Sequence, residues 1–239
     1  MCARLLLDEK KKKAVADGHY ARMATFKAKL PAYSAEAEGI LSAVDVGMDC
    51  FWWDYGQLRL YLGNNKKALL HGSPAESAEA EMMRSFFGCP GRAGDALDAD
   101  FNWVVSSELG AGSKAEASIL SSCKLGGGCD VKDCMMVAVT AKKVTGSGFL
   151  LYNVVDESEE GLEMKEGDVR ADVFIPSLGK KISMRTNVKT DSGKSWKIKL
   201  EQYGNEYSFE DVYKINFGVE VDKAVAMARE AHAALATKL

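Results

Sequence analysis

The stretch SILSSCKLGGGCDVKDCMMV, residues 118–137, places an apolar residue at every sixth position. The four residues that mark this spacing are Ile119, Leu125, Val131 and Val137. After an interruption at Lys143, Phe149 and Val155 resume the same phase. A period of six is typical of neither a helix nor a simple strand alternation. It indicates a hexapeptide-repeat-like β-solenoid, in which each six-residue side of a coil turns one apolar residue inward.

Glycine residues near the ends of these segments favour the same fold, with one irregularity. Leu109-Gly110 and Leu125-Gly126 stand where coils would start, and solenoid corners need residues that adopt a positive φ. The two pairs are 16 residues apart, whereas three six-residue sides make about 18. The alternative is a β-sandwich with accidental spacing, because several short strands at even intervals also suit sandwiches.

Helical patterns flank the solenoid segment on both sides. We expect helices over residues 8–30, over residues 57–70, and from Ser73 to Gly88, where Ser73 and Glu76 form a capping box around Pro74. A last helix over residues 219–237 carries one apolar face, made of Val221, Val225, Ala228, His232 and Leu235. The predicted fold is therefore mainly β, a solenoid flanked by N-terminal helices and a C-terminal helix.

Shifts in composition divide the chain into four parts. Residues 1–88 are helical, residues 89–100 are a linker rich in Gly, Pro and Asp, residues 101–205 hold the solenoid and the strands after it, and residues 206–239 form a helical tail. The strands after the solenoid are expected at residues 169–175, 181–188 and 196–200, with a hairpin turn at Asp191-Ser192-Gly193. Ser208 and Asp211 resemble another capping box at the start of the tail.

Composition and charge exclude some classes of function. The 239 residues carry 31 basic and 34 acidic side chains, a net charge of −3, which gives no electrostatic case for nucleic-acid binding. No apolar run is long enough for a transmembrane helix. The six cysteines form no C-x-x-C pair and no secretory signal precedes them, so we expect reduced thiols. The expected location is intracellular, in the cytoplasm, and an organelle such as a plastid stays open.

The histidines argue against the two enzyme classes that use hexapeptide solenoids. Acyltransferases of this fold need a histidine base in the coils, and carbonic-anhydrase-like enzymes need histidine ligands for their metal. The only histidines are His19, His71 and His232, all outside the solenoid segment. Cys123 and Cys129 lie one hexapeptide apart, but two thiols do not complete a metal site, and we interpret them as buried small apolar residues.

A second stretch precedes the solenoid and carries a family resemblance. Trp52-Trp53-Asp54-Tyr55-Gly56-Gln57 resembles the W-x-D-x-G-T element of sugar-1-phosphate nucleotidyltransferases, and Asn65 stands where that family has an Asn near the end of the following helix. The order of this element, a linker and a C-terminal hexapeptide β-helix is also similar to that family. The resemblance covers residues 45–155 and implies that residues 1–88 are the helical remnant of a nucleotidyltransferase-like domain.

The resemblance implies a possible metal ligand and also shows what is missing. In the family, the Asp of this element helps to hold Mg²⁺ against the phosphates, which assigns that role to Asp54 by resemblance. The competing interpretation is that Asp54 is a helix cap or turn residue. Gln57 replaces the usual Thr, and the Gly-rich nucleotide loop, the second metal-binding carboxylate and the sugar-binding Lys are absent. No catalytic or substrate-binding residue is assigned, and no cofactor is expected unless Mg²⁺ serves a completed enzyme.

Three hypotheses on function follow. The preferred one is a non-catalytic β-solenoid subunit or fragment, related to sugar nucleotidyltransferases, that acts in assembly or regulation. It would bind protein partners or itself through the solenoid and the terminal helices. The first rival is a chain that completes a nucleotidyltransferase active site with a partner, with Asp54 holding the metal. The second rival is an accessory structural subunit of a large assembly, without that ancestry.

Overall fold

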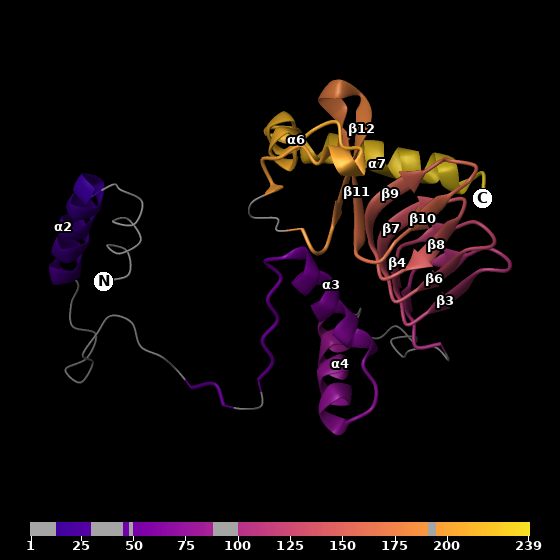
Figure 1. Ribbon diagram of the computed structural model, residues 1–239, viewed down its shortest axis with the longest axis horizontal. Coiled ribbons are helices and arrows are strands. Elements are labelled where there is room, and N and C mark those ends of the chain that lie inside the picture. Colours follow the sequence, from indigo (N-terminus) through magenta and orange to yellow (C-terminus); the bar gives the residue numbers. More distant parts are fainter. Residues whose placement is uncertain (1–12, 30–44, 48–49, 88–99, 191–194) are drawn as a thin grey trace. The chain divides into compact units, whose positions relative to one another are not determined.

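The computed structural model describes residues 13–29, 45–47, 50–87, 100–190 and 195–239. The chain divides into two compact units, Met1–Cys50 and Phe51–Leu239. The described part of the first unit contains one helix, α2 (Lys13–Lys29), which confirms the described part of the first predicted helix. The second unit holds the strands and all the other described helices (Figure 1). None of the described helices has the length and apolar character needed to cross a membrane.

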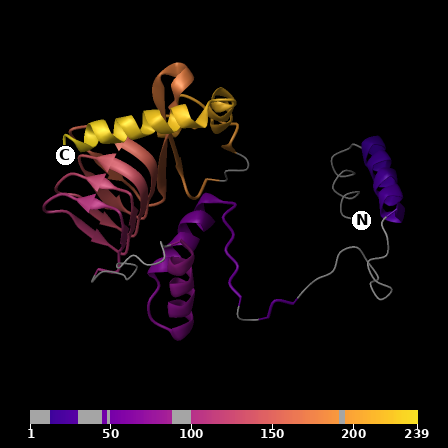
Figure 2. The ribbon, with the colours of Figure 1, turned by 180° about the vertical axis from the view of Figure 1, so that it is seen from behind.

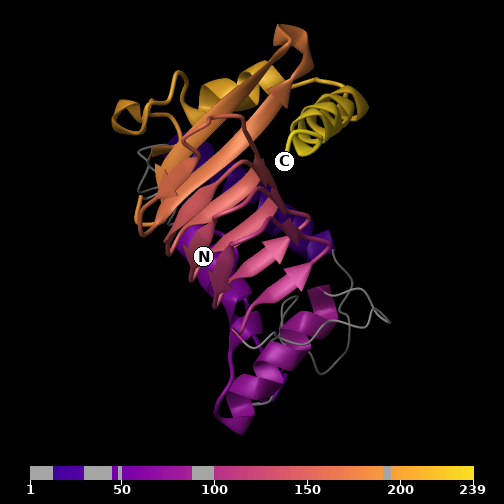
Figure 3. The same ribbon diagram turned by 90° about the vertical axis from the view of Figure 1, so that its right-hand side faces the viewer.

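The second unit is built on a parallel β-solenoid, which confirms the predicted fold class. One sheet has eight strands: β1 (Trp103–Val105), β4 (Ile119–Ser121), β7 (Met135–Ala141), β9 (Leu150–Asp156), β11 (Asp168–Ile175) and β12 (Lys180–Asn187), with β2 (Glu108–Leu109) and β5 (Lys124–Leu125) beside them. The other sheet has four: β3 (Lys114–Glu116), β6 (Asp130–Lys132), β8 (Val144–Ser147) and β10 (Leu162–Met164). Figure 3 shows the coils stacked one upon another.

The register gives the length of each coil. Trp103 pairs with Ile119, Ile119 with Met135, Met135 with Leu150, and Leu150 with Val169, so that successive coils advance by 16, 16, 15 and 19 residues. The spacing of the two Leu-Gly pairs is therefore the coil length itself. A coil of 16 residues is not a whole number of six-residue periods, so residues six apart do not keep the same position in successive coils. As a result, Leu125, Val131 and Phe149 lie in the interior cluster, whereas Ile119 and Val137 belong to a cluster on the outside.

Columns of residues in register fill the interior. One column contains Val104, Leu120, Met136, Leu151 and Arg170, in successive coils. Leu120, Met136 and Leu151 are fully buried, whereas Val104 in the first described coil is 37% exposed. Burial of this kind is the main favourable term in folding, so that each coil gains stability from the coils on either side.

Three of the described cysteines are buried and occupy a second kind of column, in which serine lies one coil below. The backbone N–H of Cys123 donates to Ser107 Oγ at 2.9 Å, and those of Cys129 and Cys134 donate to Ser113 Oγ and Ser118 Oγ at 3.2 Å, each across 16 residues. All three thiols are free and buried among apolar side chains. Burial raises the pKa of Cys134 to about 12. These cysteines are therefore buried packing residues, as expected.

Four successive coils of the described structure turn the same corner with a residue in the left-handed region. Ser106, Ser122, Ala138 and Asn153 have φ values of 49°, 56°, 52° and 53°, and they follow one another at coil spacing. A residue other than glycine loses about 1–2 kcal/mol in this conformation. Stacking offsets that cost, since the N–H of Ser122 donates to the carbonyl of Val105 in the coil below at 2.9 Å. The expected residues at such corners are Gly and Asn, and Asn153 is one of them, whereas serine or alanine makes this corner in the other three coils.

A charged cluster ends the interior column at its last coil. Arg170 is 4% exposed and contacts two buried carboxylates: its Nη1 lies 2.9 Å from Asp156 Oδ1 and its Nε 3.0 Å from Asp172 Oδ1. The ammonium of Lys181 adds a third contact, 3.2 Å from Asp172 Oδ2. Burial disfavours the charged form of Asp172, but Arg170 and Lys181 outweigh it and lower the pKa of this carboxyl. Buried charges persist only when paired in this way.

The hairpin of β11 and β12 closes the solenoid at that end. The two strands are antiparallel, joined by a short 3-10 turn at Pro176–Leu178. The outer edge of β12 is occupied in part by the buried amide of Asn205, which accepts from the N–H of Arg185 at 2.8 Å and donates to its carbonyl at 2.7 Å. A side chain that pairs in this manner protects a strand edge from pairing with other chains.

Two helices cover an outward-facing stripe on the solenoid. These are α3 (Leu58–Lys66), continued by a 3-10 turn at Lys67–Leu69, and α4 (Pro74–Phe87), which confirms the two helices predicted here. The stripe contains one residue from each coil: Trp103, Ile119, Met135, Leu150 and Val169. It packs with Leu62, Leu69 and Met83 of the helical segment. The segment after the W-x-D-x-G-like element and the solenoid therefore share one hydrophobic cluster.

The C-terminal tail adds two helices, α6 (Phe209–Asn216) and α7 (Val221–Ala236). The predicted capping box is present, because Ser208 Oγ accepts from the N–H of Asp211 and the Asp211 carboxylate accepts from the N–H of Ser208. Between β12 and α6 lies one further 3-10 turn, Glu201–Tyr203. Figure 2 shows α7 lying across the strands of the solenoid.

The strands predicted at residues 169–175 and 181–188 are confirmed, but the third is wrong. Residues 196–200 form turns and bends rather than a strand, because Trp196 and Ile198 remain exposed and find no sheet to pair with in the described structure. The hairpin turn expected at residues 191–193 lies outside the described residues. So do most of the predicted linker and the boundary at residue 88, and the predicted domain division stays a prediction.

Replacing Met136 by alanine is expected to cost about 2–5 kcal/mol of unfolding free energy, because it removes a fully buried side chain and leaves a cavity. Urea denaturation followed by circular dichroism measures the change. Val104→Ala, in the same column but partly exposed, serves as control and is expected to cost much less. Equal losses in the two variants would contradict the described burial of Met136 in the interior of the solenoid.

Candidate functional site

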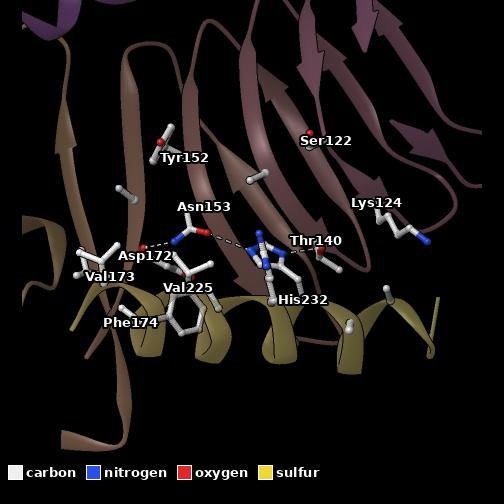
Figure 4. Close-up of a pocket in the computed structure, with 18 of the residues that line it drawn as sticks. Ser122, Lys124, Thr140, Tyr152, Asn153, Asp172, Val173, Phe174, Val225 and His232 are labelled. Atoms are coloured by element: carbon white, nitrogen blue, oxygen red, sulfur yellow. Dashed lines mark hydrogen bonds between the residues drawn. The ribbon is translucent and has the colours of Figure 1, made fainter. Parts of the chain in front are cut away.

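A cleft of about 990 Å³ lies between α7 and the outer face of the solenoid (Figure 4). Its floor includes the left-handed corner residues Ser106, Ser122, Ala138 and Asn153, whose small side chains leave space below the helix. Its other wall is the flank of α7, where alanine and valine dominate: Val221, Ala224, Val225, Ala228, Ala233 and Ala236. A mainly apolar cleft of this size with a few polar groups is typical of a ligand site.

One side of α7 holds the helix on the solenoid, and the adjacent side faces the cleft. Leu235 is fully buried and packs with Val155 of β9 and Phe174 of β11. Met227, Ala228 and Ala231 join the same cluster. Val225, by contrast, is 39% exposed and Val221 is 73% exposed. The cleft therefore exists because only part of the apolar surface of α7 is covered.

A hydrogen-bonded chain through His232 crosses the cleft between helix and sheet. His232 Nδ1 lies 2.8 Å from Thr140 Oγ1 of β7, and His232 Nε2 lies 3.2 Å from Asn153 Oδ1 of β9. The Asn153 amide in turn donates to the carbonyl of Asp172 at 2.9 Å. Because Asn153 Oδ1 only accepts, Nε2 carries the proton and Nδ1 accepts from the Thr140 hydroxyl. Each ring nitrogen of the neutral imidazole therefore has a hydrogen-bond partner.

The electrostatic surroundings favour the same neutral form. Burial lowers the pKa of His232, the nearby carboxylate of Asp172 opposes this shift, and the ammonium of Lys181 adds to it. Asp172 also pairs with Arg170 and Lys181, and its effect on the pKa of the imidazole does not outweigh that of burial. At neutral pH, His232 is therefore an uncharged hydrogen-bonding bridge that connects α7 to two coils.

The residues of the W-x-D-x-G-like element lie elsewhere, before and beside α3. Asp54 is exposed, and its Oδ1 accepts from the N–H of Gly56 at 2.7 Å, which is a turn contact. Gln57, rather than Asp54, is the N-cap of α3. The Asn64 amide donates to the carbonyl of Asp54 at 2.6 Å, whereas that of Asn65 donates to Tyr61 within the helix. The structure therefore supports the turn interpretation of Asp54.

A single carboxylate does not hold Mg²⁺, because this ion needs several oxygen ligands in near-octahedral geometry. Within the part of the chain that the structure describes, no group of three or more His, Cys, Asp or Glu side chains is placed to hold a metal ion. The donor set around Asp54 does not by itself fit the ion that the resemblance implies. The assignment of Asp54 as a metal ligand stays a prediction that requires ligands from elsewhere.

Sequence reasoning missed the role of His232. The sequence pattern places this residue on the apolar face of the last helix, outside the solenoid segment. In the fold, His232 contacts Thr140 across 92 residues and Asn153 across 79. A polar residue in the middle of an apolar helical face is the signal that could have indicated it, because such a residue needs a partner when buried. The identity of that partner depends on how α7 crosses the coils.

Comparisons with protein-family models, with curated proteins and with solved structures find no match to this chain. The relation to sugar nucleotidyltransferases is therefore a hypothesis carried by the residues of the W-x-D-x-G-like element and by the solenoid that follows it.

Lowering the pH is expected to weaken the folded state through His232. The pKa is about 6.5 in the unfolded chain and lower in the folded one. The unfolded state therefore binds more protons, and the stabilisation present above about pH 6.5 is lost as the pH falls through the folded pKa. Urea denaturation at a series of pH values from 7.5 to 5, followed for wild type and His232→Gln, measures this.

The glutamine variant keeps a neutral polar side chain at every pH of the series. The difference in unfolding free energy between wild type and variant should therefore shrink or reverse as the pH falls. A difference that stays constant over this range would show that His232 titrates as in the unfolded chain.

Proposed function

We propose that this chain is a non-catalytic β-solenoid subunit or fragment, related to sugar nucleotidyltransferases, that acts in assembly or regulation. The relation is supported by α3 and the solenoid, which share one hydrophobic cluster, so that the element resembling the family and the repeat fold as one body. The proposed setting is the cytoplasm or an organelle with reduced thiols. The activity proposed is recognition of a protein partner, and the observation that carries it lies on α6 and on the segments that flank it.

That observation is an exposed aromatic cluster made of Trp196, Tyr213 and Phe217, which we call the aromatic cluster. The ring centroids of Trp196 and Tyr213 are 5.7 Å apart, and those of Tyr213 and Phe217 are 6.2 Å apart. The three residues are 37%, 57% and 77% exposed. Adjacent aromatic side chains left in water are costly, and such groups are enriched where proteins bind one another.

A second copy of this chain is the partner that the charges around the aromatic cluster favour. Glu210 lies between two lysines, 3.7 Å from Lys197 and 3.4 Å from Lys214. A two-fold contact places the same surface opposite itself, so a rim with both signs of charge complements its own copy. The proposed assembly is a dimer in which the aromatic clusters of two chains face each other.

Replacing Phe217 by glutamate is expected to weaken this association at least tenfold, because it places a charge in an apolar contact that excludes water. Sedimentation velocity over a range of chain concentrations measures the association constant. Met82→Glu, at an exposed apolar position of α4, is the matched control and should leave the association unchanged.

Three results would contradict the proposal. The first is a wild-type chain that stays monomeric at every concentration. The second is a control variant that dissociates as readily as the Phe217 variant. The third is formation of sugar nucleotide above the level of a blank when the purified chain is supplied with Mg²⁺, a nucleoside triphosphate and a sugar 1-phosphate.

The second candidate is a chain that completes a nucleotidyltransferase with a partner. The exposed carboxylate of Asp54, beside the 87% exposed Trp52, favours it, because a ligand or a partner chain can reach both. Under this candidate, Asp54→Asn should abolish the activity of the reconstituted complex while leaving its assembly and folding intact. Steady-state rates of complexes assembled with wild-type and variant chains test it, and an unchanged rate would remove Asp54 from the active site.

A further inference from the structure

The cleft beside α7 is polarised along its length. Figure 4 shows Val173, Phe174 and Val225 at one end, Lys124 at the other, and His232 between them. The cleft residues of α7 extend from Val221 to Ala236, and a helix of 16 residues is roughly 24 Å long. The space is therefore elongated, with an apolar end that includes Val225, Arg229 about one helical turn from Val225, and Lys124 at the far end.

Arg229 supplies a positive charge that no described group neutralises. Its side chain lines the cleft, is exposed, and makes no hydrogen bond or ion pair with any residue that the structure describes. The other cleft cation, Lys124, lies 3.4 Å from Glu108 and is partly compensated. The acid of the cleft, Asp172, is already paired with Arg170 and Lys181. The net free charge offered to a bound molecule is positive.

The polar side chains at the centre of the cleft do not pair with the positive charge of Arg229. His232 is neutral, and its two ring nitrogens are engaged by Thr140 and Asn153. Arg229 and His232 are three residues apart on the same helix, which places them on neighbouring positions of one face. An anionic group beside Arg229 thus lies next to a neutral surface, with the apolar end of the cleft beyond it.

From this arrangement we propose that the cleft binds an amphipathic carboxylate, a linear or branched apolar chain that ends in an acid group. The guanidinium of Arg229 pairs with the carboxylate, since a planar fork of donors matches two carboxylate oxygens. The apolar chain lies along α7 and covers Val225 and Val173. The apolar chain of such a ligand covers apolar side chains of α7 that are otherwise exposed to water. The site is separate from the aromatic cluster, and it goes beyond the association proposed above.

Isothermal titration calorimetry of the full chain with decanoate tests this, below the concentration at which the probe forms micelles. Decyltrimethylammonium, which has the same chain and the opposite charge, is the comparison ligand. We expect saturable decanoate binding that is at least tenfold tighter than binding of the cation. Arg229→Gln should weaken decanoate binding about 10- to 100-fold, because it removes a charge-assisted pair.

Two matched controls keep the test specific. Lys223→Gln removes another α7 cation, one that is paired with Glu220 at 3.1 Å and does not line the cleft, and should leave the affinity unchanged. Val225→Glu should abolish binding, whereas Ala226→Glu, exposed on the same helix but outside the cleft, should not. Thermal unfolding of each variant confirms that it is folded.

The proposal is overturned if no saturable binding occurs or if the cationic probe binds as tightly as decanoate. It is also overturned if Arg229→Gln and Lys223→Gln behave alike. None of these results affects the aromatic cluster, whose test depends on sedimentation of the chain without ligand.

Discussion

Stacking of coils in a fixed register is the constraint on which the rest of the structure depends. A coil of this length cannot bury its interior alone, and it becomes stable only between two others. The 16-residue advance of the first coils aligns Leu120 below Met136 inside and Ile119 below Met135 outside. It also aligns Ser118 Oγ with the N–H of Cys134. One register thus fixes the core, the outer stripe and the hydrogen bonds between coils at once.

The two outward faces that this register creates receive different helices. The stripe that includes Trp103 and Leu150 is apolar in every coil, and α3 and α4 cover it. The face at the left-handed corner carries small and polar residues instead, so α7 touches it at a few points and leaves a cleft. Where apolar packing is incomplete, the hydrogen bonds of His232 with Thr140 and Asn153 connect α7 to the solenoid. The candidate site is therefore a consequence of how the corner is built.

Much of the fold could be predicted from the sequence because it depends on local signals. Helix starts at Ser73 and Ser208 are encoded by capping residues within one turn, and the solenoid by recurring apolar residues. The coil length was harder to predict from the sequence, because the six-residue spacing of apolar residues matches the interior positions of a 16-residue coil at only a few places. The strand expected at residues 196–200 failed for a different reason. Trp196 and Ile198 suit a sheet, but both stay exposed and pair with no strand that the structure describes.

The site was less predictable than the fold, because it joins residues that are far apart in the chain. Nothing local to His232 indicates that Thr140 is its partner, and nothing local to Arg229 indicates that it lacks one. Nitrogen-15 spectra of the histidine-labelled chain at pH 7 test the docking of α7 most directly. The expected result is a neutral His232 with its proton on Nε2, and magnetisation transfer from the imidazole to the Thr140 methyl group. A mixture of tautomers that titrates as in a free peptide, with no such transfer, would contradict it.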